Sequence, residues 1–342
     1  MTTLITGAAG FIGSAVARRL LLQGRRVIGI DSLNNYYDPA LKQARLSKIE
    51  CDAKSSSGSW RFEQLALEQS EQLNTLMHHE RPSIVVNLAA QVGVRYSLKN
   101  PAAYIQSNLV GFGNILESCR IYGVQHLVYA SSSSVYGGNY NLPFHEQQSV
   151  NHPISLYAAT KKANELMAHV YSHLYNLPAT GLRFFTVYGP WGRPDMAPML
   201  FAKAIVTGQP IRVFNYGCMQ RDFTYIDDVV EAVLRCCDKP ATANPEFNAL
   251  HPDPATAAAP HRVFNIGSNH PVKLLHFIAV LERALGREAI KEFQPMQPGD
   301  IITTVASTRA LDNWVRFRPS TTIEEGVKRF ADWYCSYHAY SY

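Results

Sequence analysis

A glycine-rich segment close to the N-terminus limits the folds open to this chain more than any other part of the sequence. Three glycines punctuate the run GAAGFIG, which lies between a predicted strand at residues 4–6 and a predicted helix at residues 11–23. Glycines at this spacing let the backbone turn tightly and bring amide N–H groups against a pyrophosphate at the helix N-terminus. The residues that we expect to contact such a dinucleotide are Gly7, Gly10, Phe11, Ile12 and Gly13.

Short aliphatic runs alternate with longer segments of helical periodicity through the first half of the chain. Strands are predicted at residues 27–30, 61–67, 84–88, 126–130 and 181–185, and helices up to residue 76 and at 102–122 and 156–175. The strand run at 84–86 is apolar on both faces, as in a parallel sheet covered by helices on each side. The pattern predicts an α/β fold with a Rossmann-type, doubly wound parallel sheet.

The regular alternation weakens after residue 190, where Pro and Gly mark shorter connections. We therefore predict a dinucleotide-binding domain at residues 1–190, which includes the catalytic residues proposed below. Residues 191–342 are predicted to form a smaller C-terminal α/β substrate-binding domain, some segments of which could return to the first core. Residues 241–261 are rich in Ala and Pro without apolar periodicity, which predicts an exposed loop that carries no catalytic residue.

The composition is that of an ordinary globular protein, with 46% hydrophobic and 17% charged residues. Basic residues exceed acidic ones by 32 to 27, but no window is dense enough in Lys and Arg to predict binding to nucleic acid or to an anionic membrane. The six cysteines lack metal-ligand spacing, so we expect reduced thiols and no metal site. Without a leader or an apolar stretch of about 20 residues, the protein is expected to be soluble and cytoplasmic.

An acidic residue at the end of the second strand strengthens the dinucleotide prediction. Asp31 follows Gly13 by 18 residues, where its carboxylate can accept hydrogen bonds from both hydroxyls of a ribose. A 2′-phosphate would meet the negative charge of this carboxylate, so the cofactor is expected to be NAD and not NADP. The small side chains of residues 87–90 would leave room for a flat ligand at the sheet edge, although tight strand-to-helix packing would use the same residues.

A tyrosine and a lysine form a candidate proton-transfer pair. Tyr157 and Lys161 lie four residues apart in a predicted helix, so both side chains project from one face. An ammonium beside a phenol lowers the pKa of the phenol, and the positive nicotinamide of NAD⁺ would act in the same direction. Such a tyrosine can take a proton from an alcohol while hydride leaves for the cofactor. A solvated surface pair would have the same spacing.

Four serines at residues 131–134 follow the strand predicted at 126–130 and precede Tyr136. A hydroxyl at this edge of the sheet could hydrogen-bond the reacting oxygen of a substrate. The alternative is a loop whose hydroxyls cap local backbone groups.

Together these landmarks resemble the extended short-chain dehydrogenase/reductase family and, within it, the nucleotide-sugar epimerases. Several further segments look like those of the UDP-glucuronate 4-epimerases: NNYYD at 34–38, VRYS at 94–97, RFFTVYGPWGRPDM at 183–196 and MQPGD at 296–300. The resemblance implies a dimer formed through a helix bundle, to which the helices at 105–122 and 157–175 could contribute. A packed monomer core would explain the same apolar residues.

The resemblance also implies roles for individual residues. The implied catalytic residues are Ser132, Tyr157 and Lys161. The implied NAD contacts, beyond the glycine-rich segment, are Asp31, Asn34, Leu67, Leu88, Ala89, Ala90, Asn108, Tyr157, Lys161 and Phe184. The implied contacts to a UDP-sugar are Ser132, Ser133, Ser134, Thr186, Arg193, Arg221, Gln297 and Asp300. The family's acidic residue after the third strand, which contacts adenine, is absent because Ala66 occupies its position, so backbone groups near Leu67 could hold the adenine instead.

The serine loop favours epimerisation over other fates of a 4-keto uronate. By resemblance, related dehydratases have an Asp-Glu pair, and related decarboxylases a Glu, where this chain has Ser133 and Ser134. Arg193 is the candidate clamp for the substrate carboxylate, because a guanidinium binds a carboxylate through two parallel hydrogen bonds. We therefore expect an NAD-dependent isomerase that converts UDP-glucuronate to UDP-galacturonate. The alternatives are a 4-epimerase of neutral UDP-hexoses or UDP-N-acetylhexosamines, a UDP-glucuronate decarboxylase, and a non-catalytic NAD-binding regulatory module.

Overall fold

The computed structural model describes residues 1–297 and 300–340, and its largest element is a seven-stranded sheet. Its strands pair in parallel throughout. In spatial order they are β3 (Ser59–Gln64), β2 (Arg26–Asp31), β1 (Thr2–Thr6), β4 (Ile84–Asn87), β5 (His126–Ser132), β6 (Ala179–Phe184) and β10 (His261–Ile266). The chain order reverses between β1 and β4, the position at which sheets of this type bind ligands at their carboxyl edge.

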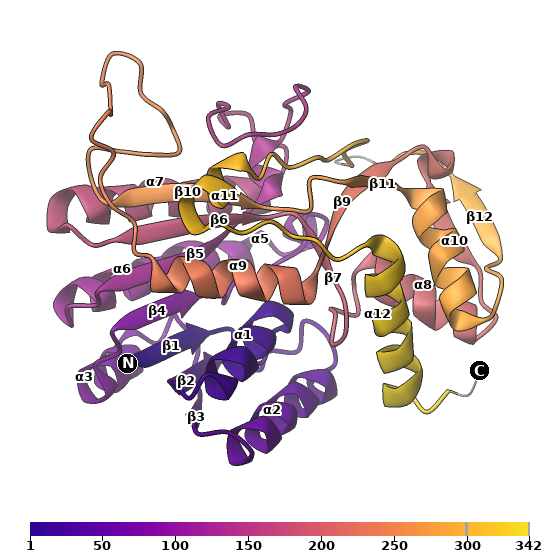
Figure 1. Ribbon diagram of the computed structural model, residues 1–342, viewed down its shortest axis with the longest axis horizontal. Coiled ribbons are helices and arrows are strands. Elements are labelled where there is room, and N and C mark those ends of the chain that lie inside the picture. Colours follow the sequence, from indigo (N-terminus) through magenta and orange to yellow (C-terminus); the bar gives the residue numbers. More distant parts are fainter. Residues whose placement is uncertain (298–299, 341–342) are drawn as a thin grey trace.

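Helices cover both faces of this sheet, as Figure 1 shows. One face is packed by α1 (Phe11–Leu22), α2 (Pro39–Lys54) and α9 (Ile226–Asp238), which contact one another through α1. The other face is packed by α3 (Ser70–Glu80), α6 (Gly111–Ile121) and α7 (Leu156–Tyr175). The predicted doubly wound α/β fold is therefore confirmed.

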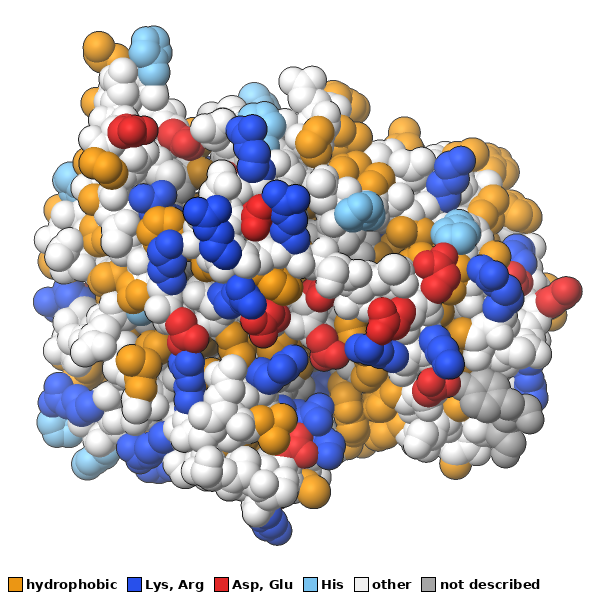
Figure 2. Space-filling model, viewed as in Figure 1, with side chains coloured by type: hydrophobic (Ala, Val, Ile, Leu, Met, Phe, Trp, Pro, Cys, Tyr) orange, Lys and Arg blue, Asp and Glu red, His pale blue; other side chains and the backbone are white. Residues whose placement is uncertain are grey.

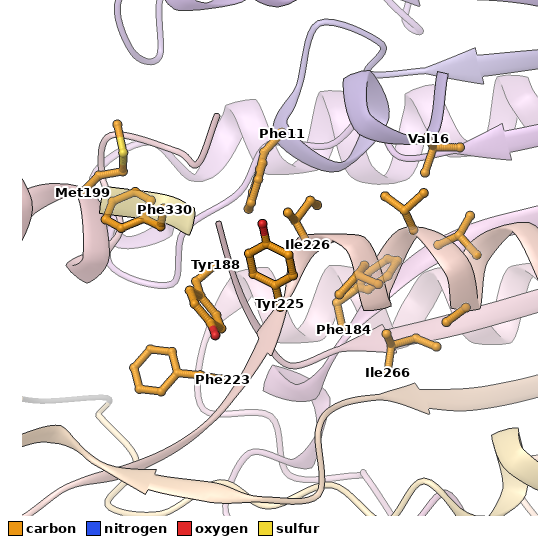
Figure 3. Close-up of a cluster of buried hydrophobic side chains, with 14 of the residues drawn as sticks. Phe11, Val16, Phe184, Tyr188, Met199, Phe223, Tyr225, Ile226, Ile266 and Phe330 are labelled. Carbon is orange, nitrogen blue, oxygen red and sulfur yellow. The ribbon is translucent and has the colours of Figure 1, made fainter. Parts of the chain in front are cut away.

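The hydrophobic core under the first face continues into the smaller part of the molecule. Figure 3 shows Phe11 at the start of α1, Ile226 at the start of α9 and Phe184 of β6 in one cluster with the aromatic rings of Tyr188 and Phe223. The continuous packing of these side chains joins the two parts of the molecule and removes their apolar surface from water.

The smaller part lies at the right of Figure 1 and contains two short sheets. One is formed by β7 (Thr186–Tyr188), β9 (Gln220–Tyr225) and β11 (Pro271–Lys273), and the other by β8 (Ile211–Phe214) and β12 (Lys291–Gln294). Its helices are α8 (Ala197–Val206), α10 (Leu274–Leu285) and α12 (Ile323–Tyr337). Shorter elements elsewhere are α4 (Tyr96–Lys99), α5 (Pro101–Tyr104), the π-helix η1 (Ile105–Val110), the 3₁₀ helices η2 (Ser133–Tyr136) and η3 (Asn215–Gly217), and α11 (Arg309–Val315).

Three elements differ from the sequence-based expectations. Helix α2 was not predicted, because its few apolar residues are separated by polar ones, yet Asp38 caps it by accepting a hydrogen bond from the Ala40 N–H. Strand β3 begins and ends earlier than the range 61–67. The single helix predicted at 102–122 is divided into α5, η1 and α6, because the π-helix interrupts the α-helical register.

The second half of the chain does not stay within the smaller part. Strand β10 belongs to the large sheet, and helices α9 and α11 pack on it. The division into two domains at residue 190 stays a prediction. Residues 241–260 form an irregular excursion at the upper left of Figure 1. The side chain of Leu250 is 84% exposed near its tip, whereas Ala257 and Ala259 are buried.

The surface carries mixed charge. Figure 2 shows Lys and Arg side chains interspersed with Asp and Glu over one face of the molecule. Several of these charges are paired at short distance, such as Arg18 with Asp52 and Arg235 with Glu231. Within residues 1–297 and 300–340, no helix has both the length and the hydropathy that crossing a bilayer requires.

Candidate active site

The glycine-rich loop between β1 and α1 packs too closely against its surroundings for larger residues. A Cβ atom added to Gly13 would lie 2.1 Å from the carbonyl oxygen of Gly7. Gly7 itself has a φ of +68°, and a Cβ there would lie 2.8 Å from the amide nitrogen of Ala89. Such distances are far below van der Waals contact, so the sequence must have glycine at both positions for this loop to close over the end of β4.

The carboxylate of Asp31 is held at the end of β2 by two backbone amides. The Ala9 N–H donates to Oδ2 at 3.2 Å, and the Leu33 N–H donates to Oδ1 at 2.9 Å. Asp31 is almost buried and lies on the wall of the cavity formed by the glycine-rich loop. Each oxygen retains acceptor capacity for a hydroxyl, and the contact of Asp31 with a ribose stays a prediction.

One cavity runs along the carboxyl edge of the large sheet and brings most of the predicted residues together. The predicted NAD contacts on its wall are Gly7, Gly10, Phe11, Ile12, Gly13, Asp31, Asn34, Leu67, Leu88, Ala89, Ala90, Tyr157, Lys161 and Phe184. The predicted substrate contacts on the same wall are Ser132, Ser133, Ser134, Thr186 and Arg193. Segments more than a hundred residues apart in the chain therefore meet at a single site.

Asn108 does not line this cavity. It is buried in the π-helix η1, where its Oδ1 accepts from the Gln91 N–H at 2.8 Å and its Nδ2 donates to the Thr160 hydroxyl at 3.0 Å. Gln91 does line the cavity. In this structure Asn108 acts through the backbone of Gln91, and its direct contact with NAD stays a prediction.

Tyr157 and Lys161 project from the first turns of α7 into the cavity, as the four-residue spacing predicts. The hydroxyl of Ser155 caps this helix by accepting from the Ala158 N–H at 3.1 Å, which fixes where the first turn begins. The Lys161 Nζ donates to the carbonyl oxygen of Ala130 at 2.9 Å, close to the end of β5. The pair therefore lies beside the serine loop.

Burial raises the pKa of Tyr157, and two neighbours oppose this shift. The Ser132 hydroxyl lowers the pKa through a hydrogen bond, and the positive charge of Arg193 lowers it through space. Burial also lowers the pKa of Lys161 to about 8. The Lys161 ammonium, which donates to the Ala130 carbonyl oxygen, keeps its positive charge near the cavity, and its expected lowering of the pKa of Tyr157 stays a prediction.

The serine loop presents hydroxyls to the cavity and no carboxylate. The Ser132 Oγ accepts from the Ser134 N–H at 3.1 Å and donates to the Ser134 Oγ at 3.1 Å. Ser131 points to a buried ion pair behind the loop, where its hydroxyl donates to Glu165 at 2.6 Å and Arg183 donates twice to the same carboxylate. This pair supports the loop from below, so the strand end that carries Ser132 has a fixed position.

Arg193 lies on the cavity wall, but its guanidinium already has one carboxylate partner. Its Nε and Nη2 donate to the two oxygens of Asp195 at 3.0 and 2.6 Å. The Tyr36 hydroxyl donates to the same carboxylate at 3.2 Å. The other guanidinium edge, formed by Nη1 and Nη2, has further donors for a second carboxylate. Asp195 and Tyr36 occur in segments that resemble the epimerases, but no sequence pattern indicates that they pair with Arg193 or with each other.

The three remaining predicted substrate residues lie outside the cavity wall. Arg221 donates to the carbonyl oxygen of Ile302 at 3.0 Å, and Asp300 forms an ion pair with Arg95 at 3.1 Å. Gln297 accepts the Asp300 N–H through its carbonyl oxygen at 3.2 Å. Pro298 and Gly299, which complete the MQPGD segment, lie outside the described residues. Arg95 follows Val94 of the cavity wall, so this polar cluster adjoins the cavity.

A carboxylate does occur near the position where the family's acidic residue is missing. Ala66 occupies that position, but Glu68, two residues later, lines the cavity and accepts a hydrogen bond from the Ser107 hydroxyl at 2.7 Å. Sequence alignment could not find it because it is displaced by two residues. Lys42 of α2 was also missed, although it lines the cavity and donates to both oxygens of Asn34 at 2.7 and 2.8 Å.

Comparisons with known proteins show which family this chain is similar to. A model of the NAD dependent epimerase/dehydratase family matches residues 3–267. Protein CapI of Staphylococcus aureus is 54% identical over 338 residues, which are 99% of each chain. A probable UDP-glucuronate 4-epimerase of Rhizobium meliloti is 46% identical over 338 residues, which are 98% of this chain and 97% of the relative.

The fold also matches a solved enzyme. The crystal structure of UDP-glucuronic acid 4-epimerase from Bacillus cereus, in complex with UDP-glucuronic acid and NAD, aligns with a TM-score of 0.86 at 29% identity. The alignment covers 98% of this chain and 100% of that one. The resemblance to nucleotide-sugar epimerases and the prediction of NAD as cofactor are thereby confirmed. This chain belongs to the NAD-dependent epimerase/dehydratase family.

Proposed function

We propose that this chain is an isomerase that interconverts UDP-glucuronate and UDP-galacturonate at carbon 4 of the sugar, through a transient 4-keto intermediate. One observation carries the proposal: the guanidinium of Arg193 and the phenol of Tyr157 line the same cavity, and the serine loop beside them contains no carboxylate. The site thus combines a group for uronate recognition with a group for proton transfer. The matches to UDP-glucuronate 4-epimerases support the same assignment.

The residues on the cavity wall fit NAD. The glycine-rich loop leaves no room for side chains where the pyrophosphate would approach, and Asp31 offers two carboxylate oxygens at the end of β2. Glu68 and the backbone near Leu67 would lie toward the adenine. When bound, NAD accepts hydride from carbon 4 of the sugar and later returns it, so the reaction has no net change of oxidation state.

Tyr157 performs the proton transfer. In its phenolate form it takes the proton of the 4-hydroxyl as the C4–H bond breaks, and it gives the proton back to the 4-oxygen when hydride has returned to the opposite face of the sugar. The Ser132 hydroxyl, whose one proton is donated to the Ser134 Oγ, can rotate and donate this proton to the 4-oxygen instead. Arg193 contributes from a second direction, because its positive charge favours the phenolate.

Arg193 also holds the substrate carboxylate. Loss of CO₂ from a 4-keto uronate is fastest when the bond between carbon 5 and the carboxylate is perpendicular to the plane of the carbonyl group at carbon 4. An epimerase must therefore hold this bond in another orientation. The free edge of the guanidinium can bind the carboxylate through two hydrogen bonds, with Thr186 and the hydroxyls of Ser133 and Ser134 as further partners. Arg221, Gln297 and Asp300 are proposed to hold the uridine diphosphate.

A product assay tests the function directly. NAD-loaded protein is incubated with UDP-glucuronate, UDP-glucose and UDP-N-acetylglucosamine, and the products are separated by chromatography. We expect UDP-galacturonate from UDP-glucuronate. UDP-xylose would identify a decarboxylase, conversion of the neutral sugars alone would identify a neutral 4-epimerase, and absence of any turnover would support a non-catalytic module.

We further propose that the protein is a homodimer formed through α6 and α7. These helices pack side by side, and α7 exposes Leu166, Val170 and Leu174 at four-residue spacing, between 47% and 61% exposed. An apolar stripe of this kind is typical of an interface between helices. Val170→Glu should convert the dimer to a monomer in light scattering, and an already monomeric wild-type protein would refute the proposal. The cytoplasmic location stays a prediction of the sequence.

A further inference from the structure

Arg193 belongs to a segment whose shape is fixed from several sides. We name residues 189–196 the clamp segment, because it carries the guanidinium proposed to hold the substrate carboxylate. The ion pair between Arg193 and Asp195 is internal to this segment. The guanidinium therefore moves with the segment, and its place in the cavity depends on what anchors the segment to the rest of the molecule.

The clamp segment contains a residue in an uncommon backbone conformation. Trp191 has a φ of +66°, a left-handed conformation that is costly for a bulky side chain. Its ring packs against Trp333 at 5.3 Å and Tyr337 at 5.1 Å between ring centres, both from α12. Packing of these aromatic rings offsets part of the conformational cost. The backbone carbonyl oxygens of the segment still need hydrogen-bond donors from other parts of the chain.

Arg45 of α2 satisfies these carbonyls. Its Nη2 donates to the carbonyl oxygens of Trp191 at 2.6 Å and Gly192 at 3.2 Å. Its Nη1 donates to the carbonyl oxygen of Ala9 at 3.0 Å and to the Tyr37 hydroxyl at 2.6 Å. One guanidinium therefore joins three separate parts of the chain: the clamp segment, the glycine-rich loop and the loop after β2.

A charged side chain at this position has a cost that a packing role does not explain. Arg45 is 1% exposed, and its hydrogen-bond acceptors in the described part of the chain are neutral carbonyl and hydroxyl oxygens. Burial lowers the pKa of its guanidinium, as expected for a cation removed from water. An apolar residue would fill the same space without that cost, so the retained charge indicates that the hydrogen bonds themselves matter.

The hydrogen bonds of Arg45 complete a continuous connection between two residues of the cavity wall, Asp31 and Arg193. The backbone N–H of Ala9 donates to Asp31, and the backbone carbonyl oxygen of Ala9 accepts from Arg45. From Arg45 the connection continues to Trp191 and Gly192, directly before Arg193. The carboxylate proposed for the NAD ribose and the guanidinium proposed for the sugar carboxylate are thus linked through one buried side chain.

We propose that Arg45 is a positioning residue for uronate recognition: it holds the clamp segment in register with the glycine-rich loop, so that Arg193 meets the sugar carboxylate while carbon 4 faces the nicotinamide. The inference rests on the proposed function. It assigns no contact between Arg45 and either ligand, since Arg45 is not on the cavity wall. Among sugar ligands, those that use the Arg193 guanidinium should therefore be affected most by a change at Arg45.

The test compares two ligands that differ only at carbon 6 of the sugar. Binding of UDP-glucuronate and UDP-glucose is measured by calorimetry on NAD-loaded Tyr157→Phe protein, in which conversion should be about a thousandfold slower. Adding Arg45→Met to this background should weaken UDP-glucuronate about tenfold, because displacement of a binding group by about an ångström has effects of this order or larger. UDP-glucose should weaken less than about twofold, since it has no carboxylate for Arg193. Arg45→Lys, which retains donors for the carbonyls, should recover part of the loss.

Other outcomes would overturn the inference. Equal weakening of both ligands would show a general structural role, and unchanged binding of both would show that Arg45 does not position Arg193. If Arg45→Met does not fold, Tyr37→Phe removes one hydrogen bond of Arg45 and should shift the ratio of the two affinities in the same direction. Failure of the proposed function is recognised separately, because wild-type protein would then produce no UDP-galacturonate.

Discussion

The two ends of the cavity are built in different ways. Around the glycine-rich loop much of the wall is backbone and small side chains, and the fit depends on the lack of a Cβ atom at Gly7 and Gly13. Around Arg193 the walls include charged and hydroxyl side chains, and the guanidinium is held by Asp195, whose carboxylate also accepts from Tyr36. Residue choice at the dinucleotide end is therefore limited by space, and residue choice at the sugar end by the pairing of charges. Substitutions at the two ends should therefore fail for different reasons.

The largest effect is expected where the two ends meet. Tyr157→Phe removes the proton acceptor without removing the ring, so kcat should fall about a thousandfold while NAD and UDP-glucuronate still bind. Turnover is measured by product chromatography, and bound NAD by its release from denatured protein. Activity equal to that of the wild type would exclude Tyr157 from the chemistry.

At the sugar end, Arg193→Leu should raise KM for UDP-glucuronate by a factor of about thirty, which corresponds to about 2 kcal/mol for a charge-assisted hydrogen-bonded pair. Affinity for UDP and the NAD content should change little, because neither ligand uses the sugar carboxylate. The measurement is steady-state kinetics with UDP inhibition as a control. If KM stays at its wild-type value, another group recognises the carboxylate.

At the dinucleotide end, Gly13→Ala should weaken NAD binding about tenfold, because the added Cβ overlaps the Gly7 carbonyl oxygen and the loop must shift. Gly113→Ala in α6 is the matched control, since a Cβ there would lie 3.6 Å from the methyl group of Met167, an ordinary contact. NAD affinity is measured by fluorescence titration of protein freed of cofactor. Equal affinities in both variants would contradict the steric account of this end.

The smallest effect concerns pH. Removing the ammonium in Lys161→Met withdraws a charge that favours the Tyr157 phenolate, so the pKa of the phenol rises and the rising limb of kcat/KM moves about one unit to higher pH. Burial lowers the pKa of Lys161 to about 8, so the wild-type protein loses this ammonium above that pH. The kcat/KM profiles of the wild type and of Lys161→Met should therefore converge above pH 8. Superimposable profiles at pH 6 to 8 would remove Lys161 from this role.

The sequence predicted what depends on local pattern. The parallel sheet, the glycine-rich loop, Asp31 and the Tyr157/Lys161 spacing were all predicted, because each follows from periodicity or from separation along one element. Helix α2 was missed because its apolar residues lack a clear period, although Asp38 followed by Pro39 is a helix-start signal.

What the sequence did not predict depends on contacts between distant residues. The pairing of Arg193 with Asp195 and Tyr36, and the contacts of Arg45 with Ala9 and Trp191, exist only after the chain has folded. The position of Asn108 behind the cavity wall follows from the π-helix, which an α-helical pattern does not reveal. The sequence patterns therefore do not predict hydrogen bonds and ion pairs between side chains of separate elements.

The anchoring of the glycine-rich loop on both sides of Ala9 has a consequence for how quickly the nucleotide can be captured. A loop whose shape already exists loses little conformational entropy when its ligand arrives, so association need not wait for a rare open form. Its amide hydrogens should also be shielded from solvent deuterium in cofactor-free protein. The Ala9 amide, which donates to Asp31, should exchange as slowly as the amides of the strands around it.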